Sequence, residues 1–442
     1  MIKIVVPNNN HSERQYIIDV IFGVFLRVPY SIEYANVDCW LIYLPSLLLK
    51  IEDAFFNKHK SSIAYLSVDN IPQSYQDDVA WGKTLLRLWG KGNYVRNTKE
   101  IYIGNDILAA SFFFLSRWEE IVIKREKGIK AEGKLPEDEL FVIKKNLYKR
   151  CVVNEYVEFI RTILSEQKIQ TRKNEFTPLL THDVDRCYLS NERELCVNIK
   201  KMLERNESAK AYRILSDYLS YPSNYNPFDS FDLLMDLAES SGTKAHFYFK
   251  ACESNESGYT YSLGDEFVSE TIAKICRRGH YVGLHASENT FHNIQQLRLE
   301  QGRLADKCPC YEKGGRNHLL MYDEEVYNNL DRAGMNYDNG LGFQYYNGFR
   351  ASVCYAYPIF NVVERKTLHL MQLQFNIMDS VSIRRELSPN DFSEQISSIL
   401  SEVKKYSGIF VSNWHSNLFL ANGRQQFIDV YKSMIQQIGE AL

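Results

Sequence analysis

Hydrophobic residues give way to carboxylates at residues 179–185, where the chain reads Leu-Leu-Thr-His-Asp-Val-Asp. The apolar start, with Pro178 at a position that the first residue of a strand tolerates, predicts a short buried strand of a parallel sheet. Side chains alternate between the two faces of a strand, so Asp183 and Asp185 are expected on the same side at its carboxyl end. An isolated Asp-x-Asp is usually a solvated turn, but two carboxylates directly after a buried strand favour a metal site or a shared proton.

Beyond residue 226, helical and extended patterns alternate regularly. The predicted helices cover 228–240, 266–278, 324–333, 391–406 and 425–438, and the predicted strands cover 244–250, 281–285, 317–321, 336–338, 368–378 and 409–414. Strands that alternate with helices of about ten to fifteen residues are typical of parallel βα units. So many units predict a barrel rather than a small open sheet. Residues 186–226 form a polar, helix-prone insertion in this scheme.

Residues 1–150 carry short strand patterns between helical ones, and their sequence has no metal-ligand cluster or phosphate-binding loop. The helix expected at 106–120 is mostly apolar and starts at Asp106, a residue type suited to capping a helix N-terminus. An amphipathic helix at 152–167 is expected to connect this part to the rest of the chain. We therefore predict a smaller N-terminal α/β domain over 1–150, with a structural or substrate-orienting role, and a second domain over 173–442.

The length of 442 residues also favours two domains, and a hydrophobic content of 45% is ample for their cores. A net charge of −3 gives no electrostatic footprint for nucleic acid or an anionic membrane. The first residues lack the features of a secretion signal, and the apolar run 16–28 is too short to span a bilayer. The sequence therefore predicts a cytoplasmic protein with no membrane span and no nucleic-acid partner.

The nine cysteines are odd in number and irregularly spaced, which fits reduced thiols better than a disulfide framework. Cys308 and Cys310 are the one close pair along the sequence, separated by Pro309. A single Cys-x-Cys is a weak signal for zinc. We expect a loop with two free thiols at this position.

Histidines cluster around the predicted strand 281–285, with three of them in the thirteen positions from His280 to His292. A helical turn after His285 would place Asn289 on the same side, one turn away, which is a spacing used by two ligands of one metal. His292, a turn further along, is an alternative to Asn289. A single strand histidine is usually a hydrogen-bonded core residue, but this density favours a site.

Gly314 and Gly315 predict a tight turn that would deliver Arg316 and His318 to the mouth of the barrel. Arg316 could orient a carboxylate there, or it could make an ordinary surface ion pair.

Two further strand ends carry candidates. Asp379 follows the run 373–378 and could be the charge partner of a histidine or an arginine. The apolar strand 409–414 leads directly to His415, which is well placed to act as a general acid.

The motifs around Asp183, His285, Arg316, Asp379 and His415 follow one another in the same order as those of a carbohydrate esterase family. They resemble the motifs of its polysaccharide deacetylases with a NodB homology domain. The resemblance extends from about Phe176 to the end of the chain. It implies a distorted (β/α) barrel that removes acyl groups from carbohydrates with the help of a divalent metal. Zinc is the metal that we expect. In that family, Asp183 would be the general base and Asp185 and His285 would be metal ligands.

The chain departs from the family at the next ligand position, where Asn289 replaces a histidine. An asparagine oxygen is neutral and is a weaker zinc ligand than imidazole. The metal would then be held more weakly, or His292 or His318 would complete the set of ligands.

The remaining resemblance concerns the acid and base. Arg316 matches the arginine that orients the base, although the Pro-Tyr that usually follows it is absent. Asp379 and the segment Asn413-Trp414-His415 match the late motifs, which makes His415 the candidate acid. Residues 348–351, 357–358 and 106–120 resemble a cytoplasmic bacterial branch with an added N-terminal domain, often linked to surface-polysaccharide synthesis.

The sequence thus predicts a metal-dependent deacetylase that hydrolyses an acetyl or similar acyl group from an amino sugar or polysaccharide precursor. The alternative is a non-catalytic carbohydrate-binding module on a degenerate barrel, for which Asn289 is the best support. Hydrolysis of an amide outside carbohydrates is a third interpretation, since motifs define a reaction better than a substrate. The sugar, the choice between N-acyl and O-acyl groups, and the oligomeric state stay open.

Overall fold

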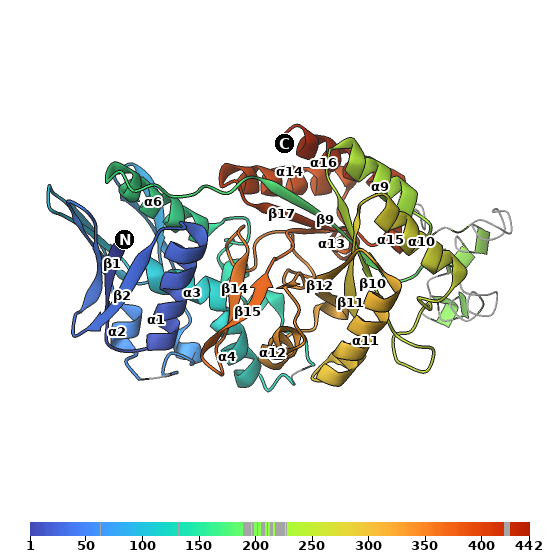
Figure 1. Cartoon of the computed structure of the whole chain (residues 1–442), viewed down its shortest axis with the longest axis horizontal. Coiled ribbons are helices and arrows are strands. Elements are labelled where there is room, and N and C mark those ends of the chain that lie inside the picture. The colour runs from blue at the N-terminus through green and yellow to red at the C-terminus, as the bar shows by residue number, and fades with distance from the viewer. Residues whose placement is uncertain are drawn as a thin grey trace. The chain divides into compact units, whose positions relative to one another are not determined.

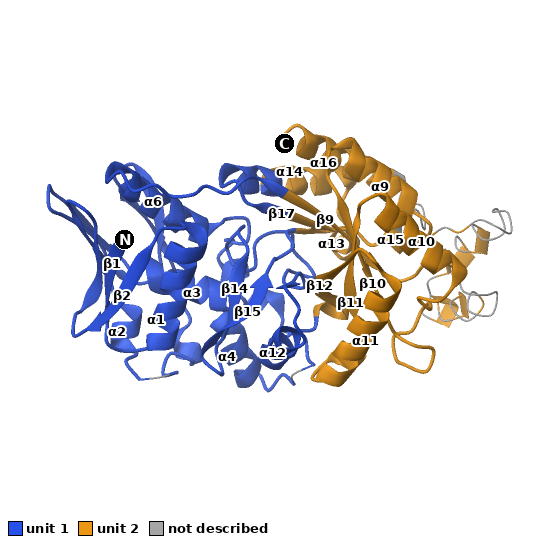
Figure 2. Ribbon diagram, viewed as in Figure 1, with its two compact units in different colours: residues 1–177, 321–376, 399–410 blue, residues 178–320, 377–398, 411–442 orange. Residues whose placement is uncertain are grey.

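The computed structural model describes residues 1–61, 63–130, 132–188, 228–419 and 425–442, with short stretches between 196 and 226. Most of the predicted insertion 186–226 therefore lies outside the described residues. The chain forms two compact units (Figure 2). Unit 1 comprises residues 1–177, 321–376 and 399–410, and unit 2 comprises residues 178–320, 377–398 and 411–442.

Unit 1 is built on a mixed six-stranded sheet with the order β2-β1-β3-β4-β8-β7 (Figure 1). Its strands are β1 (Ile2–Pro7), β2 (Tyr30–Ala35), β3 (Cys39–Tyr43), β4 (Leu48–Glu52), β7 (Gly90–Arg96) and β8 (Glu100–Asn105). Alternate residues of β3 and β4, such as Trp40, Ile42 and Ile51, are fully buried. This alternation is what a sheet with one face on the core requires.

The unit has further short strands and several helices. The strands are the hairpin of β5 (Gln76–Ala80) and β6 (Lys83–Arg87), and the row β14 (Tyr357–Asn361), β15 (Lys366–Gln372) and β13 (Tyr337–Asp338). The main helices are α1 (His11–Ile18), α3 (Ile107–Ser116), α4 (Trp118–Glu126), α6 (Val152–Glu166) and α12 (Glu324–Arg332).

The helix predicted over 106–120 is two helices in the structure. As expected, Asp106 caps the first of them, α3, by accepting a hydrogen bond from the Ala109 backbone N–H at 3.1 Å. Helix α3 ends at Ser116, the next residue Arg117 has a φ of 52° in the left-handed region, and α4 begins directly after it. The buried Arg117 guanidinium bonds to Glu120 and Tyr327, contacts that fix this break and that the apolar pattern does not reveal.

Unit 2 contains a row of strands in the order β12-β11-β10-β9-β17-β16. Their bounds are β9 (Thr177–Val184), β10 (Ala245–Phe249), β11 (Tyr281–Ala286), β12 (Tyr311–Asn317), β16 (Ile377–Met378) and β17 (Ile409–Asn413). Neighbours β9 to β12 are parallel, and so are β16 and β17. The parallel βα arrangement is thus confirmed as a mixed α/β fold, and closure into a barrel stays a prediction.

Helices α9 (Phe231–Ser240), α10 (Glu266–Arg277) and α11 (Ile294–Lys307) pack on strands β10 and β11 (Figure 1). The remaining helices are α13 (Asp379–Arg384), α14 (Pro389–Lys405), α15 (Ser416–Phe419) and α16 (Gln425–Gly439). None of the helices in the described ranges has the length and apolar character needed to cross a lipid bilayer.

The strand predicted at 317–321 is wrong in its position along the sequence. Strand β12 ends at Asn317, and residues 318–320 form a 3-10 turn. Gly314 and Gly315 lie inside the strand rather than in a tight turn. A Cβ at Gly315 would lie 1.9 Å from the Leu284 carbonyl oxygen, so glycine is needed there for β11 and β12 to approach.

Candidate active site

The candidate residues of unit 2 gather at the carboxyl ends of its parallel strands. Asp183 is the penultimate residue of β9, His285 that of β11 and Arg316 that of β12. Because neighbouring parallel strands end at the same edge of a sheet, these side chains meet there although they are far apart in sequence. His415 follows β17, and Asp379 follows β16.

Asp185, His285 and His318 form a compact cluster of metal-ligand side chains, with one ligand atom from each lying within 4.8 Å of the others. The Asp185 Oδ1 atom is 3.4 Å from His285 Nε2 and 3.6 Å from His318 Nε2. This oxygen is buried and receives no hydrogen bond of ordinary geometry from the described residues. A carboxylate and two imidazoles are a donor set that suits zinc and related divalent ions.

Hydrogen bonds at the outer ring nitrogens orient both histidines toward Asp185. His285 Nδ1 donates to the Arg316 carbonyl oxygen at 3.1 Å, and His318 Nδ1 donates to Glu288 Oε1 at 3.1 Å. Burial, together with the charges of His285 and Lys250, lowers the pKa of His318 to about 3. Both Nε2 atoms therefore face Asp185, and His318 is neutral, as a metal ligand must be.

Lys250 is a member of this cluster that the sequence pattern did not single out. It directly follows β10, is buried, and its Nζ lies 3.4 Å from both Asp185 Oδ1 and His318 Nε2. Its place in the sequence could have marked it as a candidate, because the predicted strand 244–250 ends on this lysine. Its ammonium gives the cluster a positive charge of its own.

Asp183 is buried beside the cluster and is held in its charged form. Burial opposes ionisation, but the charges of Arg316 and His285 outweigh it and lower the pKa of Asp183. Arg316 Nε lies 3.5 Å from Asp183 Oδ1, and Asn413 Nδ2 donates to Oδ2 at 2.9 Å. An ionised, oriented carboxylate is able to accept a proton.

Arg316 is itself fixed by two partners from β9 and β10, strands that do not pair with β12. Its Nη2 donates to Thr181 Oγ1 at 2.5 Å, and the guanidinium lies 5.0 Å from the centre of the Tyr248 ring. The sequence identified neither partner, because motif spacing does not show which side chains of non-adjacent strands meet.

His415 and Asp379 form a close ion pair. His415 Nδ1 donates to Asp379 Oδ1 at 2.6 Å, and the His415 backbone N–H donates to Oδ2 at 3.0 Å. Burial opposes protonation, but attraction to Asp379 outweighs it and raises the pKa of His415 to about 9. The Nε2 atom lies 3.8 Å from Asp183 Oδ2, so a protonated imidazole faces the ionised carboxylate.

The other two sequence candidates lie outside this cluster of contacts. Asn289 belongs to a 3-10 turn, Glu288–Thr290, and its amide donates to the Ser257 carbonyl oxygen at 3.0 Å. His292 is exposed and stacks on Phe291 at 4.1 Å. The histidine that approaches Asp185 and His285 is instead His318.

Comparisons with known proteins bear on each part of the chain differently. Residues 2–169 match a family of unknown function, DUF7033. No curated protein matches the chain. Among solved structures, a provisionally assigned polysaccharide deacetylase from Mycobacterium smegmatis is 14% identical with a TM-score of 0.39, covering 61% of this chain and 85% of its own.

A second solved structure is a provisionally assigned polysaccharide deacetylase involved in O-antigen biosynthesis in Bordetella bronchiseptica. It is 12% identical with a TM-score of 0.27, covering 60% of this chain and 82% of its own. At such low TM-scores these likenesses carry no argument about activity.

Proposed function

We propose that unit 2 is a metal-dependent hydrolase that removes an acetyl or similar acyl group from a carbohydrate. The observation that carries this proposal is the position of a charged Asp183 and a protonated His415 beside the cluster of Asp185, His285 and His318. Acyl transfer to water needs a base, an acid and a means to stabilise negative charge on oxygen, and this arrangement offers all of them.

The proposed metal is a divalent ion, and zinc is the expected one. Bound by Asp185, His285 and His318, it would polarise the acyl oxygen and acidify a water molecule. Asp183 would take the proton from the attacking water, with Arg316 keeping its carboxylate ionised and oriented. His415 would donate the proton that the leaving amine or alkoxide requires, and Asp379 would hold its ring. In this assignment Asn289 is not a metal ligand, although the sequence alone favours it as the third ligand.

The substrate class is proposed from the resemblance of the sequence motifs to deacetylases. We propose an acylated amino sugar or polysaccharide precursor, in surface-polysaccharide synthesis. We also keep the N-terminal domain over 1–150 as a proposal, with a structural or substrate-orienting role.

Lys250 favours a second candidate function, a carbohydrate-binding module that works without metal. Its ammonium lies 3.4 Å from Asp185 Oδ1 and could neutralise this carboxylate in place of a metal ion. Metal content separates the two functions, because a binding module of this kind would purify without a bound ion.

The test combines metal analysis with hydrolysis of acetylated amino-sugar oligomers. In protein purified without reductant, we expect about one divalent ion per chain in the parent, in Asn289→Ala and in Asp183→Ala and His415→Ala, but none in His285→Ala or His318→Ala. Asp183→Ala and His415→Ala should lower turnover by about 10²–10⁴-fold while keeping the metal. Metal lost from Asn289→Ala but kept in His318→Ala would reverse the ligand assignment.

Two results would reject the hydrolase. One is full turnover in Asp183→Ala or His415→Ala. The other is a parent protein that binds no metal even after incubation with zinc or cobalt, which would leave the binding module as the better account.

A further inference from the structure

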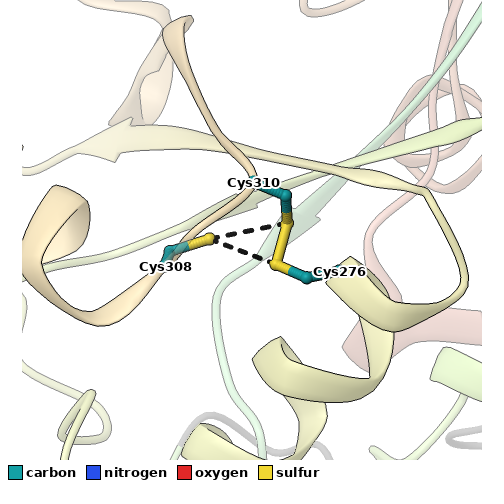
Figure 3. Close-up of side chains that lie close together, drawn as sticks. All are labelled: Cys276, Cys308 and Cys310. Carbon is teal, nitrogen blue, oxygen red and sulfur yellow. Dashed lines mark hydrogen bonds between the residues drawn. A yellow bond between two sulfur atoms is a disulfide. The ribbon is translucent and has the colours of Figure 1, made fainter.

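Three cysteines of unit 2 lie together at a place that the proposed hydrolase does not use (Figure 3). Cys276 comes from the last turn of α10, and Cys308 and Cys310 come from the segment between α11 and β12. Cys276 and Cys310 form a disulfide, so the expectation of two free thiols at 308 and 310 is wrong for Cys310. The pairing escaped sequence analysis because its partner is 34 residues away, on a helix.

The cluster lies at the opposite ends of the strands from the candidate active site. Cys310 immediately precedes β12, and its carbonyl oxygen accepts a hydrogen bond from Val282, near the start of β11. His285 and Arg316 are near the carboxyl ends of the same two strands. The sulfur cluster is therefore a separate place on the fold, and an inference about it does not depend on the proposed hydrolase.

The position of Cys308 distinguishes between two uses of these sulfurs, disulfide exchange and the binding of a metal ion. Its Sγ is 3.7 Å from Cys276 Sγ and 3.7 Å from Cys310 Sγ. A thiolate that exchanges with a disulfide attacks along the axis of the sulfur–sulfur bond. Cys308 is equidistant from both sulfurs, so it lies beside that bond, which is a poor position for exchange.

The same distances fit a shared metal ion. With zinc–sulfur bonds of about 2.3 Å, sulfur atoms in a tetrahedral thiolate shell are about 3.8 Å apart. Both separations made by Cys308 have this size already, and only the Cys276–Cys310 pair would need to open. Cys308 is also 3% exposed, so the site would be sheltered from solvent on that side.

We propose that, once the disulfide is reduced, Cys276, Cys308 and Cys310 bind a thiophilic divalent metal of the zinc class. With a phosphine as reductant, phosphorus is oxidised to the phosphine oxide with oxygen from water, and the disulfide becomes two thiols. Binding of the metal then displaces the three thiol protons to solvent. The site is redox-dependent, because the disulfide removes two of its three ligands.

The test uses the full-length chain with His285→Ala, so that the candidate active site does not contribute a signal. Cobalt is titrated into the phosphine-reduced and the unreduced protein while sulfur-to-cobalt charge-transfer absorption is recorded. We expect one cobalt per chain with this absorption in the reduced protein and none in the unreduced protein. Adding Cys308→Ser or Cys310→Ser should abolish the absorption, whereas Cys39→Ser, a control in unit 1, should leave it unchanged.

Circular dichroism of each variant shows whether it is folded, and Cys276→Ser replaces any variant that is not. Absence of the absorption in the reduced protein, or its survival in folded Cys308→Ser, would overturn the metal site. Peptide mapping that finds Cys276 paired with Cys308 as well as with Cys310 in the unreduced protein would assign the cluster to disulfide exchange instead.

Discussion

Lys250 puts a positive charge among the proposed metal ligands, and this charge should weaken metal binding. Its Nζ is 3.4 Å from Asp185 Oδ1, an atom that the metal would also contact. Unit charges about 4 Å apart interact by ~4 kcal/mol at an effective dielectric of 20, and ~1.4 kcal/mol is a tenfold change in affinity. We expect Lys250→Met to bind zinc at least about tenfold more tightly than the parent.

Competition with a chromophoric chelator measures this affinity. Lys244→Met, at the exposed start of the same strand segment, is the matched control and should bind zinc as the parent does. An unchanged or weaker affinity in Lys250→Met would mean that the lysine does not oppose the metal.

The His415–Asp379 pair makes a prediction about stability and pH. The folded pKa of His415 is about 9 against an ordinary 6.5. Below pH 6.5 the ring is protonated in the folded and the unfolded chain, so the stabilisation is fully present there, and it is lost as the pH rises through about 9. A shift of this size corresponds to ~3 kcal/mol for a buried group.

Urea unfolding of the metal-free protein tests this expectation. The free energy of unfolding of the parent should exceed that of Asp379→Asn most below pH 6.5, and the difference should shrink toward pH 9. The exposed Asp391 provides a control, because Asp391→Asn should give a difference that does not change over this range. Parallel curves for the parent and Asp379→Asn would contradict the assigned ion pair.

At the level of single residues, the sequence located the strand ends that meet, but it could not choose among neighbouring ligands. Asp183, Asp185, His285 and His415 come together because each follows an apolar strand pattern, although their roles stay predictions. The choice between Asn289 and His318 depends on the register of β12 against β11, which motif spacing does not contain. Lys250 was missed although the predicted strand 244–250 ends on it, because motif spacing does not show which strand ends meet.

Two motifs that are far apart in sequence meet inside unit 1, where Glu120 of α4 pairs with Arg350. Arg350 Nε lies 2.9 Å from Glu120 Oε1, and the two side chains are 7% and 8% exposed. Burial opposes ionisation, but Arg350 and Arg117 outweigh it and lower the pKa of Glu120 to about 2. Glu120→Gln should cost ~3–5 kcal/mol, because it removes the buried carboxylate that the guanidinium groups of Arg117 and Arg350 share.

Urea unfolding at neutral pH measures this cost, which should vanish as the pH falls from 4.5 through about 2 and Glu120 becomes protonated. Glu139→Gln is the control, since Glu139 pairs with Lys127 and Lys144 in solvent and its loss should matter little. Equal costs for Glu120→Gln and Glu139→Gln would contradict this role.

At the level of elements, the alternating pattern predicted the regular part of unit 2 and failed where a pattern is weak. Strands β9, β10, β11 and β17 are near their predicted positions. Helix α11 was missed because only Leu297, Glu300 and Leu304 of its residues are buried, which is a narrow apolar stripe. A closed barrel and a domain boundary near residue 150 depend on long-range closure and packing, which periodicity does not encode, and both stay predictions.

At the level of the whole molecule, the two units should respond differently to metal. All the proposed ligands belong to unit 2. A ligand that binds the native state adds ~2.7 kcal/mol of stability when its concentration is a hundred times its dissociation constant. We expect this gain in the strands that carry the ligands, β9 and β11, and much less in β1 and β3 of unit 1.

Hydrogen exchange with and without zinc measures this gain strand by strand, since protection reports local opening free energies. The protein is kept unreduced, so that the disulfide of Cys276 and Cys310 closes the sulfur cluster to metal. His285→Ala should lose the zinc-dependent protection of β9 and β11. Equal protection of β1 and β3 would mean that the units unfold together, and no protection in either unit would contradict metal binding at Asp185, His285 and His318.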